Sequence, residues 1–426
     1  MSLFTKGSSA LHTIFASLKH RDFRIFWFGQ CISLIGTWMQ RTALVWLVYT
    51  LTNSPFYVGL IGVAQFLPMM LFTLFAGAVV DRFPKRRILL VTQTAYMLQA
   101  FALTLLAWRG NAHYWQLLLL CALLGITTTV DMPARFSYLV ELVGRKDIVN
   151  AVSLNSTIVN LARIIGPAAA GLVMTHFGAP LCFLLNAISF LAVLYSLTRI
   201  TSEEQPEPAK NKSVLKEVRE GLLYIKNDPI LRTDAVFLAV LCTFAMNVEV
   251  IVPVFAKTVL HLGAGAYTEL LSAAGAGSLL GAVAMAAISA KGVRKGAFIL
   301  GAASSIGAQL MMTAAVFTES RELSLFIVAA IGFSNLVFLN AGNAIFQVNV
   351  PNQYRGRVMS VYSFLTQGST PIGNFFAGSV MQAAGGWAGF PACGLACVLC
   401  LWPFVKKHRA LIAEWLKKPQ PEAKKG

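Results

Sequence analysis

Charged side chains are scarce in this sequence of 426 residues, because Asp, Glu, Lys and Arg together make up 12% of it. A soluble globular chain carries roughly 25% of these residues. Residues 57–80 and 115–130 contain no charged residue at all, and a helix needs roughly 20 apolar residues to cross the hydrocarbon core of a bilayer. We therefore predict an all-α membrane protein. The continuous apolar runs exclude a soluble enzyme and the alternating strands of a membrane β-barrel.

Several motifs of chemical catalysis and metal binding are also missing. There is no Walker A motif, so we expect no ATP hydrolysis by the chain. The six histidines are scattered and the seven cysteines all stand in apolar stretches, which favours buried thiols over disulfides or metal sites. The glycines between Gly275 and Gly281 lie inside an apolar stretch and indicate a helix-packing face rather than a nucleotide loop. We expect a protein that is not an enzyme and has no metal and no cofactor.

Twelve stretches are long and apolar enough to be membrane spans. Their approximate limits are 24–51, 57–80, 87–108, 114–134, 149–175, 179–199, 230–256, 266–290, 296–317, 323–346, 357–383 and 387–405. The only long polar stretch between spans separates two sets of six. We therefore predict an N-terminal six-helix bundle over 1–200, a cytoplasmic linker over 201–228, and a C-terminal six-helix bundle over 229–426 that ends in a basic tail.

The basic residues follow the predicted topology. With the N-terminus in the cytoplasm, 30 of the 35 Lys and Arg residues fall in cytoplasmic segments, as the positive-inside rule requires. Both termini are therefore expected in the cytoplasm. The formal charge of +17 indicates topology and attraction to anionic lipids, and we expect no nucleic-acid partner.

The two halves contain an internal repeat. Gly166, Gly171, Gly178 and the pair Val173-Met174 reappear 207 residues later as Gly373, Gly378, Gly385 and Val380-Met381. Two six-helix halves repeated in parallel orientation are typical of transporters in which the substrate site lies near mid-membrane between the halves.

A short basic motif follows the second predicted span. It includes Gly77, Asp81, Arg82, Lys85 and Arg86, and it resembles the signature of the major facilitator superfamily, with Pro84 where that family usually has glycine. The resemblance implies two pseudo-symmetric six-helix bundles that work by alternating access. It also implies that Asp81 latches the halves together in one state, near Arg355 and Arg357 of span 11. The alternative is a tight loop whose charges only fix topology.

Span 5 contains a second motif. Gly166, Pro167 and Gly171 resemble the glycine-proline motif of proton-coupled exporters of that superfamily, although packing alone also explains these small residues. Asp131-Met132-Pro133-Ala134-Arg135, Asn160 to Pro167 and Tyr354 to Ser360 are similar to a bacterial branch that includes the enterobactin exporter and macrolide efflux proteins.

Charged residues inside spans mark the candidate functional positions, because each costs about 2.5–3.5 kcal/mol to insert. Arg41 on span 1 and Glu249 on span 7 lie at similar depths, and the repeat offset maps Arg41 to within one residue of Glu249. We expect them to pair and Glu249 to exchange a proton, since burial and a nearby cation act oppositely on a carboxyl group. A static ion pair is the alternative.

Other polar residues complete the candidate set. Asp131 and Arg135 are four residues apart and can pair on one helical face, either as a cytoplasmic gate or second proton site or as a structural pair near the end of span 4. Arg163 is expected to meet an anionic substrate or Asp131. Asp234 suits the N-terminus of span 7 and is expected to be structural. The remaining candidates are polar residues within spans: Gln30, Thr37, Asn160, Asn247, Asn340, Asn343 and Gln367.

The sequence thus predicts a monomeric secondary transporter of the bacterial inner membrane. We expect it to export an amphipathic small molecule, a siderophore or a drug, in exchange for protons. The alternatives are proton-coupled uptake or lipid flipping by the same fold, and a membrane sensor or assembly protein that does not transport.

Overall fold

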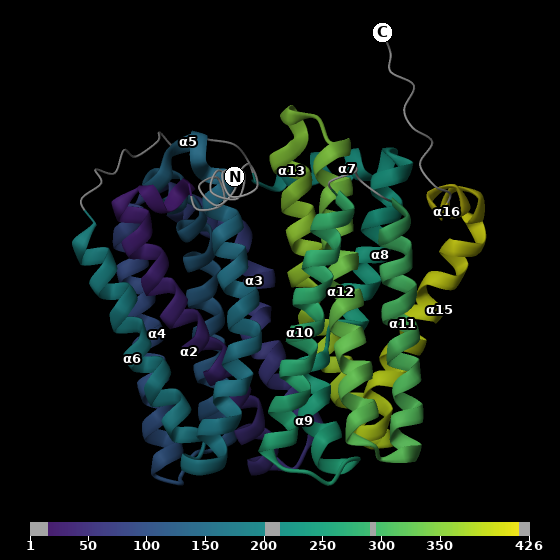
Figure 1. The fold of residues 1–426 in the computed structure, drawn as a ribbon. Helices are drawn as coiled ribbons and strands as arrows, with labels where there is room; N and C mark the ends of the chain where they lie inside the picture. Colours follow the sequence, from purple (N-terminus) through teal and green to yellow (C-terminus); the bar gives the residue numbers. More distant parts are fainter. Residues whose placement is uncertain (1–15, 201–213, 290–294, 417–426) are drawn as a thin grey trace, which may run out of the picture. The chain divides into compact units, whose positions relative to one another are not determined.

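The computed structural model describes residues 16–200, 214–289 and 295–416, and these residues form helices (Figure 1). The helices of the first half are η1 (Ala16–Lys19), α2 (Arg21–Thr52), α3 (Pro55–Arg82), α4 (Lys85–Trp108), α5 (Tyr114–Phe177) and α6 (Ala179–Arg199). After α7 (Val214–Asn227) come α8 (Pro229–Phe244), α9 (Val248–Thr258), α10 (Ala264–Ser289), α11 (Lys295–Thr318) and α12 (Arg321–Asn349). The chain continues with α13 (Asn352–Ser363), η2 (Phe364–Gly368), α14 (Thr370–Ala384), η3 (Gly386–Ala388), α15 (Gly389–Lys407) and α16 (Arg409–Leu416).

The prediction of an all-α membrane protein is confirmed. Over the residues that the structure describes, eleven helical stretches have the length and apolar composition to cross a membrane, and each overlaps a predicted span. The remaining predicted span, 357–383, is interrupted, because η2 is a π-helical turn between α13 and α14. Such turns inside helices are frequent at functional sites, and the candidate residue Gln367 lies in this one.

Internal contacts divide the chain into two compact units that do not follow the two halves of the sequence. Unit 1 comprises Met1–Leu47 and Leu71–Lys210, and unit 2 comprises Val48–Met70 and Asn211–Gly426. The end of α2 and the first part of α3 therefore belong with the helices of the second half. The predicted division at 1–200, 201–228 and 229–426 follows the internal repeat rather than this packing, and it stays a prediction.

The repeat is visible in how two helices end. Gly178 ends α5 at φ +81° and Gly385 ends α14 at φ +98°, a region that glycine enters without steric cost. The N–H of Gly178 donates to the Met174 carbonyl at 3.1 Å and that of Gly385 donates to the Met381 carbonyl at 3.0 Å. The same glycine therefore caps the same helix in both halves, 207 residues apart.

The repeat is also visible in packing. A Cβ at Gly166 on α5 would lie 3.1 Å from the Met39 nitrogen of α2, and a Cβ at Gly373 on α14 would lie 2.7 Å from Asn247 Oδ1, just beyond α8. Because 39 and 247 are themselves about 207 residues apart, both glycines pack against equivalent parts of the repeated helices.

Helices α10 and α12 touch through their backbones. A Cβ at Gly277 would meet the Ala329 carbonyl, and a Cβ at Gly332 would meet the Ala274 carbonyl. Ser278 Oγ donates to the Gly332 carbonyl at 3.2 Å. Small residues permit this close approach, which is a main source of helix association in membranes. The predicted helix-packing face is therefore seen at Gly277 and Ser278.

Gly332→Leu is expected to destabilise unit 2 by about 1–3 kcal/mol, because overpacking forces the α10 and α12 backbones apart. The measurement is the thermal unfolding temperature of the purified protein in detergent. Gly307→Leu on α11 is the matched control, since a Cβ at Gly307 meets nothing within 4 Å. Equal unfolding temperatures for the two variants would contradict the close packing.

Candidate functional site

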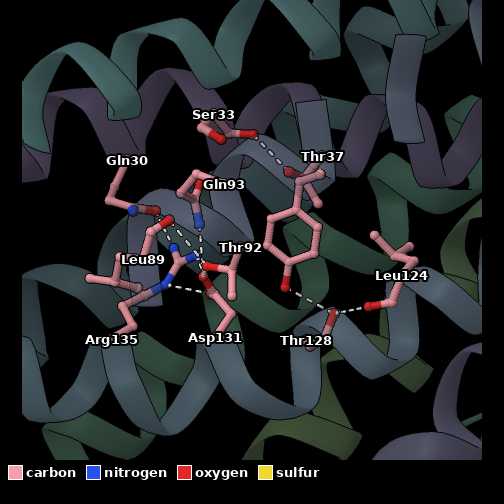
Figure 2. A network of polar contacts seen from close by, with 11 residues as sticks. Gln30, Ser33, Thr37, Leu89, Thr92, Gln93, Leu124, Thr128, Asp131 and Arg135 are labelled. Carbon is pink, nitrogen blue, oxygen red and sulfur yellow. Dashed lines mark hydrogen bonds and ion pairs between the residues drawn. The ribbon is translucent and has the colours of Figure 1, made fainter. Parts of the chain in front are cut away.

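Asp131, which is 3% exposed, lies at the centre of a polar network between α2, α4 and α5 (Figure 2). Its Oδ1 accepts hydrogen bonds from Thr92 Oγ1 at 2.6 Å and from Gln93 Nε2 at 2.8 Å. Its Oδ2 forms an ion pair with Arg135, with Nη2 at 2.5 Å and Nε at 3.1 Å. Arg135 Nη1 donates to Gln30 Oε1. These four bonds to the carboxylate offset the cost of burying its charge.

The structure brings Asp131 and Arg135 together but corrects their place in the helix. The predicted span ends at residue 134, whereas the helical stretch continues to Gly144. Asp131 therefore lies 13 residues from that end, about 20 Å at 1.5 Å per residue. The helix continues past Arg135 through a further, mostly apolar stretch up to Gly144, and the Asp131 carboxylate neutralises the guanidinium within it.

A second row of buried amides crosses unit 1. Gln40 Nε2 on α2 donates to Gln99 Oε1 on α4 at 3.0 Å, and Asn186 Nδ2 on α6 donates to Gln40 Oε1 at 2.8 Å. Sequence reasoning missed this row, and it missed Thr92 and Gln93, because it weighed charges and the polar stripes of other spans. The sequence does carry a signal for these residues, because each is an uncharged polar side chain inside an apolar span. Such a side chain must find its hydrogen-bond partners within the protein.

Trp38 on α2 joins two arginines of unit 1. The guanidinium carbons of Arg41 and Arg163 lie over its ring, 5.3 and 5.1 Å from the centroid. Arg41 stands 11 residues before the end of α2 and Arg163 stands 14 residues before the end of α5, at least about 16 Å inside each helix. The structure thus brings two predicted charges onto one aromatic ring, in a cation–π arrangement that stabilises each of them.

Gly166 explains how α5 comes so close to Trp38. A Cβ at Gly166 would meet the Trp38 Cβ, so only glycine allows this approach, and Arg163 lies one turn before it. Pro167 and Gly171 follow on α5, and both are buried. Proline removes a backbone donor and loosens the helix at this point.

Two predicted polar residues bond within their own helices. Thr37 Oγ1 donates to the Ser33 carbonyl at 2.9 Å, and Asn160 Nδ2 donates to the Ser156 carbonyl at 2.9 Å. These bonds satisfy the side chains locally, as is common for such residues in helices. The structure therefore gives Thr37 and Asn160 no bond that joins one helix to another.

The polar residues of α12 differ in exposure. Asn340 is exposed and Asn343 is partly buried. Gln347 Nε2, one turn after Asn343, donates to Asn343 Oδ1. The structure therefore places Asn343 in a polar row along α12, whereas Asn340 remains a separate candidate.

Span 7 is broken between α8 and α9. Asn247 is 2% exposed at the break, and its Nδ2 donates to the Thr243 carbonyl at 2.8 Å. The Ala245 carbonyl accepts from Gln309 Nε2 of α11 at 3.3 Å and from Asn335 Nδ2 of α12 at 3.4 Å. Carbonyls freed by a helix break are thus satisfied by side chains of neighbouring helices, as membrane burial requires.

Glu249 stands in the first turn of α9, directly after this break. A carboxylate is favoured at a helix N-terminus by the helix dipole. Arg41 belongs to unit 1 and Glu249 to unit 2, and their pairing stays a prediction.

Two basic residues of the motif after span 2 bond within unit 1. Lys85 Nζ lies 3.6 Å from Glu141 Oε1 of α5. Arg86 Nε donates to the Leu197 carbonyl of α6 at 2.7 Å. Both side chains therefore tie the start of α4 to neighbouring helices.

The other residues of this motif lie in α3. Arg82 is exposed at the end of α3. Gly77 and Asp81 lie in α3, and the structure does not describe the surroundings of either residue. The latch role of Asp81 stays a prediction.

The described residues thus form membrane-spanning helices with charged and amide side chains buried among apolar ones, as is typical of membrane transporters. Residues 12–415 match the family described as transmembrane secretion effector. The chain therefore belongs to this family, a branch of the major facilitator superfamily. It is a multi-pass membrane transporter of small molecules and not an enzyme.

Relatives of known name match over most of their length. The multidrug efflux pump Tap of Mycolicibacterium fortuitum is 29% identical over 85% of this chain and 90% of its own. The staphyloferrin A transporter of Staphylococcus aureus is 24% identical over 92% of this chain and 98% of its own. Macrolide efflux protein A of Streptococcus pyogenes is 21% identical over 91% of this chain and 97% of its own.

Solved structures show the same fold. A POT family transporter in complex with 5-aminolevulinic acid has a TM-score of 0.74 at 13% identity and covers 92% of this chain and 96% of its own. The nucleoside transporter NupG has a TM-score of 0.70 at 12% identity and covers 93% of this chain and 100% of its own. At this identity the likeness concerns the major facilitator fold alone.

Asp131→Asn is expected to lower the free energy of unfolding by about 3 kcal/mol, because Arg135 would remain buried without its counter-ion. The measurement is equilibrium unfolding in detergent. The double variant Asp131→Asn with Arg135→Gln is expected to recover most of the loss, since both charges are then removed. A double variant less stable than Asp131→Asn alone would contradict this account of the pair.

Proposed function

We propose that this protein exports an amphipathic small molecule, a drug or a siderophore, in exchange for protons. The names of the relatives support this class of substrate, because two of them are efflux proteins and one is a siderophore transporter. We place the protein in the bacterial inner membrane as a monomer with both termini in the cytoplasm. The excess of lysine and arginine in the predicted cytoplasmic segments supports this orientation.

The observation that carries the proposal is the group formed by Trp38, Arg41 and Arg163. Its side chains are all partly exposed although they stand deep inside membrane-spanning helices. Arginine is too costly to face lipid, so the exposed part of this group faces a polar cavity. A guanidinium binds carboxylates in a bidentate fork and an indole offers a flat apolar face, which together suit a molecule with an acidic group and an apolar body.

Unpaired amide atoms near Asp131 support the same cavity. Gln30 Nε2 and Gln93 Oε1 are buried and have no hydrogen-bond partner among the residues that the structure describes. Buried polar atoms are normally satisfied by protein, water or ligand. One donor and one acceptor beside the same carboxylate are therefore suited to bind water or a polar group of the substrate.

Glu249 is the proposed link between substrate and proton gradient. It stands beside the break in span 7, where the backbone changes direction between two short helices. Broken helices bear coupling-ion sites in many transporters. A movement at the break changes the solvation of this carboxyl group, so the group takes up a proton in one state and releases it in the other.

Alternating access supplies the mechanical part of the proposal. Residues 48–70 pack against α9 and α14 of the same unit: Ser54 Oγ donates to Gln382 Oε1 at 2.7 Å, and Lys257 Nζ donates to Asn53 Oδ1 at 2.7 Å. In the proposed topology these contacts lie on the outer side of the membrane. We propose that they close this side and separate when the substrate is released.

Glu249→Gln is expected to lower proton-driven export at least about tenfold while the protein stays folded, because the amide cannot carry a proton. The measurement is export of the anionic amphipathic dye 8-anilino-1-naphthalenesulfonate into everted membrane vesicles that are energised by a pH gradient. Glu322→Gln is the matched control, since this glutamate is exposed. No gradient-driven dye movement by the unaltered protein would contradict the proposed export of this dye, and unchanged export by Glu249→Gln would contradict the role of Glu249.

Cross-linking tests alternating access. In a variant without native cysteines, Ser54→Cys together with Gln382→Cys is expected to form a disulfide on oxidation, because the two native side chains are in contact. Export should then stop and should return after reduction. Each single substitution, oxidised in the same way, is the control. Full export by completely cross-linked protein would show that these contacts need not separate.

A further inference from the structure

Asp234 is a buried carboxyl group that the proposed mechanism does not yet use. It lies in the second turn of α8 and is 0% exposed. Within the described part of the chain, neither of its carboxylate oxygens has a hydrogen-bond partner. Buried polar side chains are almost always hydrogen-bonded, and charged ones are paired. This group therefore requires an explanation.

Asp234 does not cap the start of α8, the place where the sequence suggests a structural role for it. Asp228 caps α8 instead: its Oδ1 accepts from the Ile230 nitrogen at 2.8 Å and from the Leu231 nitrogen at 3.0 Å. Asp234 stands five residues after the first residue of α8, beyond the free backbone N–H groups of the first turn. Its carboxyl group therefore does not serve as the cap.

The Asp234 carboxyl group is packed against a glycine and aromatic rings. A Cβ at Gly342 of α12 would lie 3.0 Å from Asp234 Oδ1 and 3.1 Å from the Phe298 ring. That ring is stacked on Phe338, with centroids 4.7 Å apart. A side chain at 342 would therefore press on both the carboxyl group and the aromatic ring beside it.

Two titratable groups lie within electrostatic reach of Asp234. They are Tyr362 of α13 and Cys242 on α8 itself. On the other packed elements, Cys397 of α15 lies close to Cys242, and Glu220 of α7 forms an ion pair with Arg357 of α13 at 2.6 Å. Glu220 and Arg357 therefore neutralise each other.

We propose that the Asp234 carboxyl group is a second proton-binding site of the transport cycle. The proposal rests on the proton coupling proposed above and adds a residue to it. A carboxylic acid without hydrogen-bond partners is tolerated in an apolar interior far better than a carboxylate. The group therefore keeps its proton while α8 and α12 stay packed around Gly342, and it releases the proton when water reaches it.

A polar row connects this region with the exposed end of α12. The Tyr362 hydroxyl interacts with Asn343, and Gln347 donates to Asn343. Gln347 is exposed and stands two residues before the end of α12 at Asn349. Hydroxyl and amide groups spaced along a helix face order water between them, and this row provides a path for the proton to the cytoplasmic side.

The break in span 7 allows α8 to move separately from α9. The helix ends at Phe244, and α9 starts only at Val248. A short segment with a break at one end can shift as a rigid body, as hinge and shear motions do in other proteins. A small shift of α8 relative to α12 would admit water to Asp234 without unfolding either helix.

Asp234→Asn is expected to lower gradient-driven export of the same anionic dye at least about tenfold, while exchange of this dye across vesicles without a gradient stays within about twofold. A purely structural role would lower both activities together. Asp234→Glu is expected to restore part of the gradient-driven export, because it restores the acid. Asp228→Asn is the matched control on the same helix, since an asparagine still caps it.

A second measurement uses the unaltered chain and does not depend on the folding of a variant. A hydrophobic carbodiimide, dicyclohexylcarbodiimide, reacts with protonated carboxyl groups in apolar surroundings, and mass spectrometry locates the adduct. Asp234 is expected to be modified at neutral pH, in parallel with the loss of gradient-driven export. A chain in which Asp234 stays unmodified while export is lost would overturn the proposal.

The outcomes separate this inference from the proposed function. If the unaltered protein exports the anionic dye on a proton gradient and Asp234→Asn does the same, the inference fails and the export proposal stands. If the unaltered protein only exchanges the dye and never responds to the gradient, proton coupling fails, and the role of Asp234 fails with it.

Discussion

Lipid offers no partners to a polar group, and this constraint shapes the whole protein. A charge or amide placed inside a membrane-spanning helix must find its partners within the protein, because an unpaired group in hydrocarbon is costly. Asp131 shows the consequence: its carboxylate accepts bonds from α4 and from its own helix, and Arg135 carries the connection on to Gln30 of α2. Polar groups therefore act as fixed contact points between helices that lipid would otherwise keep separate.

Glycine supplies the complementary constraint. Where polar partners have to meet, the helices must first approach closely, and Gly166 does this for α5 and Trp38. The same position in the repeat, Gly373, brings α14 to the break in span 7. At this point the first half has two arginines over the ring of Trp38, whereas the second half has a helix break at Asn247. The repeated backbone therefore holds different polar groups in the two halves.

Much of this protein is predictable from local patterns. Apolar runs locate the spans, because length and hydropathy alone decide whether a helix can cross a bilayer. The spacing of Asp131 and Arg135 places them on one helical face, and the structure shows their ion pair. Sequence reasoning failed where a contact joins distant segments: Thr92 and Gln93 carry no pattern that connects them with Asp131. The cap of α8 was missed for another reason, because the local signal of Asp228 directly before Pro229 was not weighed. The π-helical turn at Phe364–Gly368 was also missed, because its composition does not distinguish it from an α-helix.

The sequence by itself determined the helical membrane class and the approximate limits of eleven spans, since both depend on residues close together in the chain, and it showed the internal repeat through the matching residues of the two halves. Only the tertiary structure decided which polar groups meet, which carboxyl group is left without a partner, and that residues 48–70 pack with the second half. These features depend on how helices rotate about their axes and how closely their backbones approach. Those quantities are set by side chains from several helices at once, and no single stretch of sequence contains them.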